Sequence, residues 1–200
     1  MSAGTRADIR SSGRLLASVI GWKDEAYLED LREKTRRGLA GQVRRGFSAG
    51  GRTYGYHTEQ VVDSSKLDTH GNPYVNGYRR VAAEDEATVI RRIFAEYANG
   101  KSPKAIAREL NRDRIAPPRG TRTKGWTWTA LVGNTHLGTG ILNNSLYIGR
   151  HVWNRFRWEK DPETGKRAPR LRPQDDWVMV ERPELRIVPP ETWEHVKTRQ

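Results

Sequence analysis

The sequence predicts an α+β fold in which a long N-terminal helix and a linker precede a compact mixed domain. We expect that domain to contain a helix-turn-helix-like core and short antiparallel strands. Some segments repeat apolar residues at helical spacing, and others are short runs in which apolar and polar residues alternate. Turns rich in Gly and Pro separate these segments. The length of 200 residues suits one compact domain with an added element.

The chain is strongly basic, with 36 Lys and Arg against 24 Asp and Glu and a net charge of +12. Such an excess favours a polyanionic partner, and nucleic acid is the first candidate. The absence of cysteine excludes disulfides and Cys-ligated zinc or iron–sulfur sites. The apolar run from Leu15 to Ile20 is too short for a signal peptide or a membrane span. We therefore expect a soluble, cytoplasmic, nucleoid-associated protein without a membrane partner.

Residues 1–21 lack periodicity and are predicted to be a flexible lead-in, whereas residues 22–46 are predicted to form a long helix that Gly46 ends. The apolar stripe of this helix consists of Leu28, Leu31, Thr35, Leu39 and Val43. Acidic residues come early and basic residues late, which complements the helix dipole. A solvated helix face also explains these charges, but it explains the preference for late arginines less well. The DNA-contact candidates on this helix are Arg36, Arg37, Arg44 and Arg45.

Residues 47–56 are rich in Gly and aromatic residues, and they are predicted to be either a linker or the start of a strand. Gly50 and Gly51 carry no side chains beside Arg52, so the backbone can approach another surface closely. We therefore assign Arg52 to the minor groove of DNA, as in the arm segments of other DNA-binding proteins.

Residues 57–200 are predicted to form the main domain. Two short strands are expected at Val61–Val62 and at residues 78–81, with a polar loop over residues 64–77 between them. A helix is expected from Glu84 to Asn99, because apolar residues lie on one face. A third helix begins with Ser102 as its N-cap and Pro103 in its first turn.

The second half of this domain is less regular. Residues 111–124 form a loop rich in Pro and Arg, and a further helical segment after Trp126 is interrupted by glycines. Residues 147–158 alternate as a half-buried strand does, and residues 161–165 are a charged turn. Another strand is expected over residues 177–180 and a helix from Pro190 onward. Because that helix is still periodic at the last residue, we expect the domain to be truncated there.

Consecutive short helices predict a helix-turn-helix-like arrangement in which a later helix enters the major groove of DNA. The expected phosphate contacts around it are Lys104, Arg108, Arg119, Arg122 and Arg150. The expected contacts to base edges are Thr127, Thr129, Asn134 and His136. Two alternatives remain: Thr and Asn residues cap helices, and Trp126 and Trp128 belong to the core.

Catalytic chemistry has little support in the residues. The five histidines show no metal-ligand spacing, and no Gly-rich loop ends in Gly-Lys-Ser/Thr. A tyrosine-nucleophile DNA enzyme is also disfavoured, because His195 is followed by Lys197 and Thr198 and not by the expected His-x-x-Arg. We expect no metal, no cofactor and no catalytic residue.

Several segments, taken in order, carry a family resemblance. Two of them come early: KTRRGL at 34–39 and GGRTYGY at 50–56. The others are VIRRIFAEY at 89–97, SPKAIA at 102–107, GILNNSLYIGR at 140–150, WNR at 153–155, KDPETGKR at 160–167 and PELRIV at 183–188. Together they resemble large serine recombinases of the resolvase/invertase type: the first two resemble the end of the long helix and the linker of that family, and the others resemble its recombinase DNA-binding domain. The resemblance spans about residues 22–200.

The resemblance implies that residues 22–46 are the end of a catalytic domain and that residues 57–200 bind double-stranded DNA in the site-specific recombination of mobile elements. Family members carry a Tyr-x-Arg-x-Ser nucleophile motif well before the long helix. This chain offers Arg10-x-Ser12, but Asp8 stands where the Tyr would be, and Ser12 lies too close to residue 22 for a catalytic domain to fit between them. We therefore expect DNA binding without strand cleavage by this polypeptide alone.

Other functions remain open at this point. The chain could be a transcription regulator, a recombination accessory protein or an inactive recombinase remnant. An RNA-binding or membrane-surface module would rest on charge alone. The expected partners are double-stranded DNA and, through the helix over residues 22–46, a second copy or a full-length recombinase.

Overall fold

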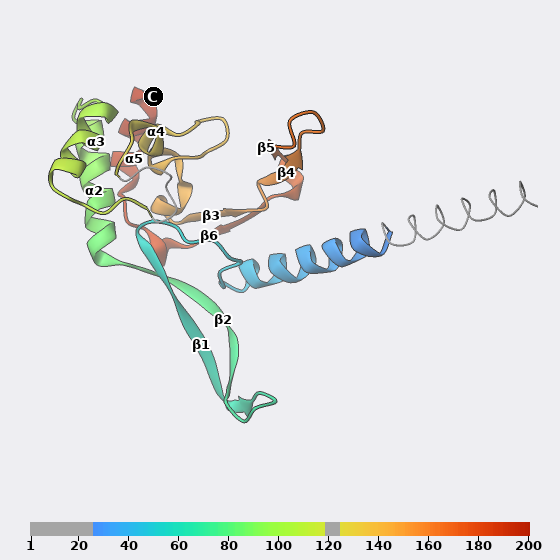
Figure 1. Ribbon diagram of the computed structural model, residues 1–200. Coiled ribbons are helices and arrows are strands. Elements are labelled where there is room, and N and C mark those ends of the chain that lie inside the picture. The colour runs from blue at the N-terminus through green and yellow to red at the C-terminus, as the bar shows by residue number, and fades with distance from the viewer. Residues whose placement is uncertain (1–25, 119–124) are drawn as a thin grey trace, which may run out of the picture. The chain divides into compact units, whose positions relative to one another are not determined.

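The computed structural model describes residues 26–118 and 125–200 and has a mixed α+β fold, as predicted (Figure 1). The chain divides into two compact units, residues 1–41 and 42–200, which are described separately. The predicted lead-in and the first residues of the predicted long helix, 22–25, lie outside the described residues. No helix in the described part of the chain is long and apolar enough to span a membrane.

Residues 26–44 are helical. In the first unit the helix carries ion pairs one turn apart, such as Asp30–Lys34 at 2.6 Å, while Leu28 and Leu31 of its apolar stripe are exposed. In the second unit the helix ends in a Schellman motif, because Gly46 N–H donates to the Val43 carbonyl (3.0 Å) and Phe47 N–H donates to the Gln42 carbonyl (2.9 Å). Gly46 has a φ of +91°, so the predicted C-cap is confirmed.

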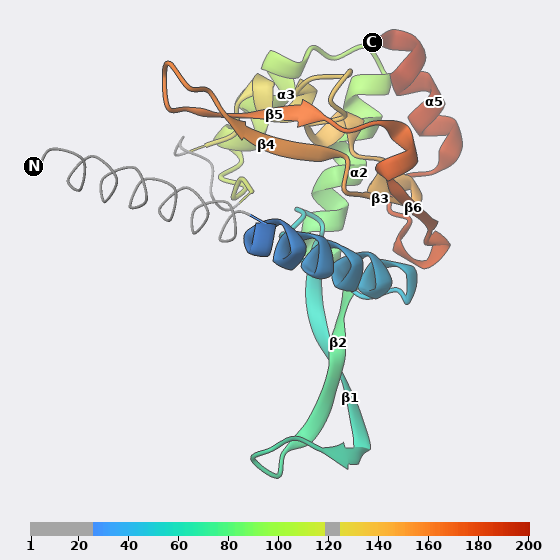
Figure 2. The same cartoon turned by 90° about the vertical axis from the view of Figure 1, so that its right-hand side faces the viewer.

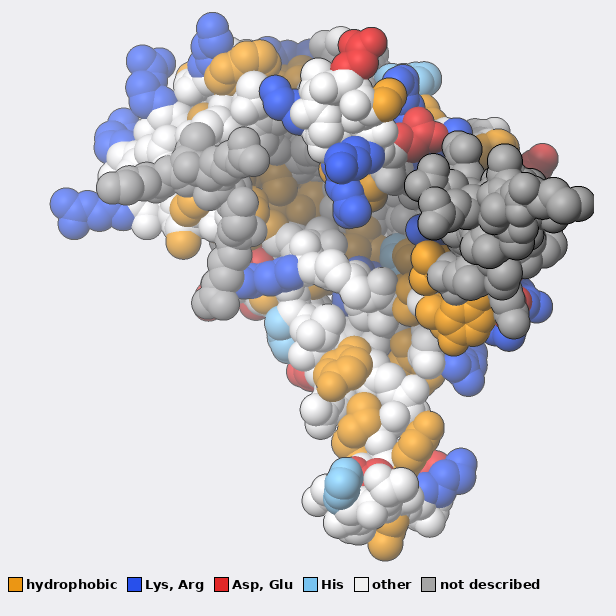
Figure 3. Space-filling view, turned by 45° about the vertical axis from the view of Figure 1, so that its right-hand side comes forward, with side chains coloured by type: hydrophobic (Ala, Val, Ile, Leu, Met, Phe, Trp, Pro, Cys, Tyr) orange, Lys and Arg blue, Asp and Glu red, His pale blue; other side chains and the backbone are white. Residues whose placement is uncertain are grey.

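Strands β1 (Tyr56–Leu67) and β2 (Pro73–Ala82) form a long antiparallel hairpin. In Figures 1 and 2 it runs away from the helices of the second unit, and Figure 3 shows hydrophobic side chains at its surface. The predicted polar loop over residues 64–77 is therefore wrong, and the turn is confined to Asp68–Asn72, where Asp68 Oδ1 accepts from the backbone N–H of Asn72 (2.9 Å). The polar residues of both strands pair through backbone hydrogen bonds. Because neither face of this two-stranded ribbon is buried, its sequence does not need the alternation of apolar and polar residues that marks other strands.

The core of the second unit lies between three helices: α2 (Glu84–Ala98), α3 (Pro103–Arg112) and α5 (Pro190–Arg199). All three were predicted, together with the N-cap of α3, where Ser102 Oγ accepts from Ala105 N–H (3.3 Å). The fully buried side chains include Ile90, Ile93, Phe94, Ile106, Leu110 and Val196. Tyr54 and Tyr56 belong to this core, so the end of the predicted linker is anchored in the domain.

Helix α4 (Trp128–Val132) is a single short turn, followed by the 3₁₀ helices η1 (Ile141–Asn143) and η2 (Ser145–Ile148). Gly133 ends α4 with a φ of +56°, and a Cβ there would lie 2.0 Å from the Thr139 carbonyl oxygen. The predicted interruption by glycine is thus confirmed. The cause is close backbone packing as well as the unusual φ.

Two small antiparallel sheets complete the fold. In the first, β3 (Arg150–Trp153) pairs with β6 (Val178–Glu181), and in the second, β4 (Phe156–Lys160) pairs with β5 (Arg167–Leu171). The 3₁₀ helices η3 (Gln174–Asp176) and η4 (Pro183–Leu185) flank β6. The single strand predicted over residues 147–158 is wrong, because Asn154 has a φ of +61° and separates β3 from β4. Its side-chain amide holds this bend by donating to the Asp176 carbonyl (2.9 Å).

The buried Tyr56 hydroxyl ties the start of the hairpin to the C-terminal half of the domain. Its single O–H is shared as donor by the carbonyl oxygens of Leu146 and Leu185, which lie 3.0 Å and 2.6 Å from the hydroxyl oxygen. Burial raises the pKa of the Tyr56 phenol, so it stays protonated and remains a donor. The Tyr56 ring also stacks on the Tyr147 ring, with their centroids 6.0 Å apart.

We predict that Tyr56→Phe lowers the free energy of unfolding by about 1–3 kcal/mol, because two buried carbonyl groups lose their donor. Tyr74→Phe is the matched control, since Tyr74 lies exposed on β2 and should cost little. Urea denaturation of both variants measures the difference. Equal stability of the two variants would show that the hydroxyl of Tyr56 does not hold the hairpin to the domain.

Candidate nucleic-acid interface

A groove of about 470 Å³ lies between α3 and the segment that begins α4. Its lining consists of Lys104, Ala107, Arg108 and Asn111 from α3, and of Trp126, Thr127, Trp128 and Thr129 from the facing segment. Four of these residues, Lys104, Arg108, Thr127 and Thr129, are DNA contacts that the sequence predicted.

Helix α3 supplies the basic side of the groove. Ile106, Ala107 and Leu110 are buried on its inner face, so the residues between them point outward. Lys104 and Arg108 are four residues apart, which places both exposed cations one turn from each other on the same face. The helix therefore presents two adjacent positive charges to the groove.

Asn111 fixes the opposite side of the groove. Its Nδ2 donates to the Trp126 carbonyl (2.8 Å), and its Oδ1 accepts from the Trp126 N–H (2.7 Å). Trp126 is only 4% exposed, donates its indole N–H to the Ile115 carbonyl (3.0 Å) and packs edge-on against Tyr54. The core assignment of Trp126 is thereby confirmed.

Trp128 was the other candidate for the core, and that interpretation is wrong. Its side chain is 48% exposed, and the Lys104 ammonium lies 5.9 Å from its ring centroid, at the outer limit of a cation–π contact. Thr127 Oγ1 accepts from Ala130 N–H (3.2 Å) and is the N-cap of α4, while Thr129 Oγ1 lies exposed 3.0 Å from it. The groove is thus lined by an exposed indole together with two cations and two hydroxyl groups.

Among the described residues, carboxylates near the groove cations are paired with other cations. Lys101 pairs with Glu96 (3.0 Å) and Glu109 (2.6 Å), and Arg92 pairs with Asp113 (2.8 Å). The hydrogen bond from Arg92 holds the pKa of Asp113 below its usual value. Within residues 26–118 and 125–200, no carboxylate lies at ion-pair distance from either groove cation, Lys104 or Arg108.

The loop after α4 carries the remaining predicted base contacts. Asn134 Oδ1 accepts from Leu137 N–H (2.9 Å), so this side chain caps a turn, as the alternative interpretation expected. His136 is exposed, and its carbonyl accepts from Arg155 (3.1 Å). Arg155 in turn lies over the Trp177 ring at 4.8 Å, which anchors the loop to the C-terminal half.

The other predicted contacts lie apart from the groove. Arg150 pairs with Glu181 across β3 and β6 (3.0 Å), and Arg52 pairs with Glu86 of α2. Arg36 and Arg37 both pair with Glu33 inside their own helix. Arg44 and Arg45 lie at the C-terminal end of that helix, where the Arg45 guanidinium lies 5.9 Å from the Phe47 ring. Arg119 and Arg122 lie outside the described residues.

Sequence reasoning missed Asn111 as the residue that shapes the groove. A hydrogen bond across 15 residues leaves no local pattern. The exposure of Trp128 had no such signal, because residues two apart in an extended segment share a face, and it is the start of α4 at Trp128 that ends this alternation.

A comparison with protein families matches the one described as Recombinase over residues 84–200. The matched segment contains α2, α3, α4 and α5, and it includes the entire groove. A comparison with curated proteins finds no match. Because the family match covers more than half of the chain, the chain belongs to the Recombinase family.

Proposed function

We propose that this chain binds double-stranded DNA in site-specific recombination of the large serine recombinase type, and that its residues supply no serine nucleophile. Family membership supports a role in site-specific recombination with DNA as the partner. The observation that carries the proposal is the exposed indole of Trp128 beside Lys104 and Arg108, two cations without acidic partners among the described residues.

The groove suits DNA for electrostatic and geometric reasons. Lys104 and Arg108 would contact phosphates, because uncompensated cations gain most from displacing condensed counterions. Exposed hydroxyl groups such as that of Thr129 reach base edges in the major groove. In this proposal α3 and α4 act as a helix-turn-helix-like pair, and residues 57–200 form the DNA-binding domain. Arg119 and Arg122, which lie outside the described residues, would add phosphate contacts.

Asn134 and His136 would contact base edges from the loop after α4. The Asn134 Oδ1 is used within the turn, but among the described residues no partner is found for its Nδ2 amide, which keeps a donor for a base. Two of the proposed contacts would have to exchange partners on binding. Arg150 would leave Glu181 for a phosphate, and Arg52 would leave Glu86 for the minor groove.

The helix that includes residues 26–44 would have a separate role. In the family resemblance it follows a catalytic domain, and its exposed Leu28, Leu31 and Leu39 are suited to pair with a second copy or a full-length recombinase. Its arginines Arg36, Arg37, Arg44 and Arg45 would then lie along the DNA between paired subunits.

We predict that Arg108→Ala makes the negative slope of log affinity against log salt concentration shallower by about 0.9, because one phosphate contact is lost on duplex DNA. Affinity should fall similarly for every sequence, since a phosphate carries no sequence information. Arg91→Ala is the matched control: Arg91 lies on α2, is bound to Glu84 (2.6 Å) and should leave the slope unchanged. Fluorescence anisotropy across a salt series measures both, and an unchanged slope for Arg108→Ala would remove this residue from the interface.

We also predict that Asn134→Asp preserves the melting temperature but lowers the ratio of cognate to random affinity. The binding free energy that separates cognate from random DNA should fall by roughly 1–3 kcal/mol. The carboxylate still caps the turn at Leu137 N–H, whereas the amide donor for a base is lost. Asn134→Ala is the companion variant and should lower the melting temperature as well. If Asn134→Asp keeps the cognate-to-random ratio of the original protein, Asn134 serves the turn and not recognition.

A further inference from the structure

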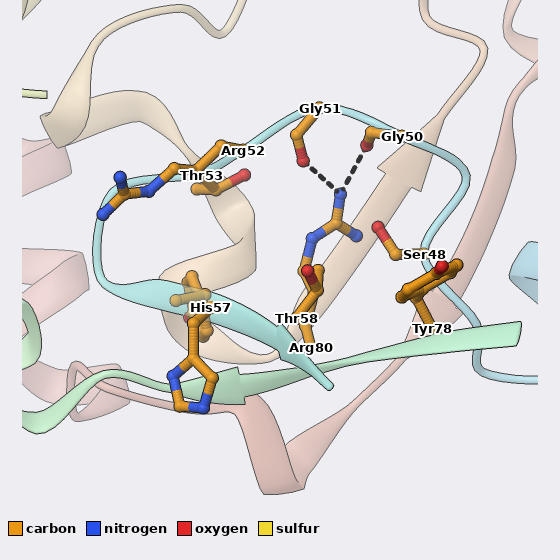
Figure 4. A pocket seen from close by; sticks show the side chains of 10 residues that line it. Ser48, Gly50, Gly51, Arg52, Thr53, His57, Thr58, Tyr78 and Arg80 are labelled. Atoms are coloured by element: carbon orange, nitrogen blue, oxygen red, sulfur yellow. Dashed lines mark hydrogen bonds between the residues drawn. The ribbon is translucent and has the colours of Figure 1, made fainter. Parts of the chain in front are cut away.

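A second pocket, of about 620 Å³, lies where the hairpin leaves the domain (Figure 4). One wall is the segment from Ser48 to Thr53, and the other is formed by the first residues of β1 and the last residues of β2. Figure 4 shows the Arg80 guanidinium of β2 directed at the carbonyl groups of Gly50 and Gly51, with Ser48 and Tyr78 beside it. The pocket therefore holds a cation under a glycine-rich segment.

Arg80 is bound by neutral groups. Its Nη2 donates to the Gly50 (3.0 Å) and Gly51 (3.4 Å) carbonyl oxygens, and its Nη1 donates to His151 Nε2 (3.2 Å). Burial, together with the nearby Arg80 and Arg182, lowers the pKa of His151 to about 4, so this imidazole is neutral at pH 7. In the part of the chain that the structure describes, no carboxylate lies at ion-pair distance from Arg80.

The second cation of the pocket, Arg52, differs from Arg80 because it has an acidic partner. Arg52 is paired with Glu86, whose other oxygen accepts from Gly55 N–H (2.8 Å). The charge of Arg52 is thus compensated by a carboxylate, whereas that of Arg80 has no acidic partner among the described residues. A guanidinium withdrawn from water without a counterion is costly, and its charge favours an anion that enters the same pocket.

The remaining donors fit a phosphate group. A guanidinium has five N–H donors, and the contacts to the two carbonyls and to His151 leave some of them unused. Ser48 adds a hydroxyl group to the pocket lining. Planar guanidinium groups and hydroxyl donors are the groups that proteins use for phosphate oxygens.

We propose that this pocket binds a phosphate of the DNA backbone, with Arg80 as its principal ligand. The inference rests on the proposed DNA-binding function, because the source of the phosphate is the duplex that Arg52 would approach from the same segment. Arg80 would then set the position of residues 48–53 on the DNA, and its hydrogen bonds to Gly50 and Gly51 would transmit that position to the backbone.

The test uses the full chain with Arg80→Gln, and Arg79→Gln is the matched control. Arg79 is the exposed neighbour on β2 and points to the opposite face of the ribbon, so both changes remove one charge from the same strand. With a mixed-sequence duplex, Arg80→Gln should make the negative slope of log affinity against log salt concentration shallower by about 0.9. Arg79→Gln should leave this salt slope unchanged. Equal slopes for the two variants would overturn the proposal.

A third variant separates charge from folding. Arg80→Lys keeps the positive charge and should retain the salt slope, whereas a purely structural role for Arg80 would lower the melting temperature of Arg80→Gln and leave its slope unchanged. A lower melting temperature of Arg80→Gln with an unchanged salt slope would also overturn the proposal.

A further arm does not depend on DNA. The melting temperature of each protein is compared in inorganic phosphate and in chloride at equal ionic strength, and phosphate should stabilise the original protein but not Arg80→Gln. If the original protein does not bind duplex but shows this phosphate effect, the proposed DNA function fails, while the anion pocket stands with free phosphate compounds as its ligand. If phosphate stabilises Arg80→Gln as much as the original protein, the pocket is not a phosphate site.

Discussion

The two hydrogen bonds between the Asn111 side chain and the backbone of Trp126 are the constraint on which the candidate interface depends. They hold the segment that begins α4 to α3. One residue of the pair two positions apart, Trp126, is thereby buried, and the other, Trp128, is left exposed beside Lys104. The Asn111 amide also satisfies both the backbone N–H and the carbonyl of the buried Trp126. The groove therefore depends on the hydrogen bonds that attach Trp126 to Asn111 of α3.

The distribution of charge gives this groove its character. Carboxylates on α2 and α3 are bound to Arg92 and Lys101, so the outward cations of α3 face no neutralising partner among the described residues. The same division recurs at the base of the hairpin, where Arg52 is paired with Glu86 and Arg80 is bound by neutral groups. The excess of basic residues behind the net charge of +12 thus includes cations without acidic partners among the described residues, in the groove and at the base of the hairpin. These cations determine where a polyanion would bind.

The helices could be predicted from the sequence because their signals are local. Apolar spacing marked α2 and α5, Ser102 marked the start of α3, and Gly46 marked the end of the preceding helix. The hairpin was predicted too short because a two-stranded ribbon with two exposed faces has no alternation to detect. Half of the residues that line the groove were foreseen, Lys104 and Arg108 from their charge and Thr127 and Thr129 from their hydroxyl groups. The contacts that shape the two pockets join residues far apart in the chain, and no local pattern encodes them.

The most direct measurement follows the indole N–H resonances of the ¹⁵N-labelled full chain during titration with duplex DNA. Trp128→Phe and Trp158→Phe assign two indoles that are exposed among the described residues. Trp158 is 64% exposed on β4 and reports on binding at the β4–β5 hairpin. Binding through the groove predicts a progressive shift of the Trp128 resonance while that of Trp158 stays in place. A shift of Trp158 with Trp128 unchanged would contradict the account and move the interface to the β4–β5 hairpin.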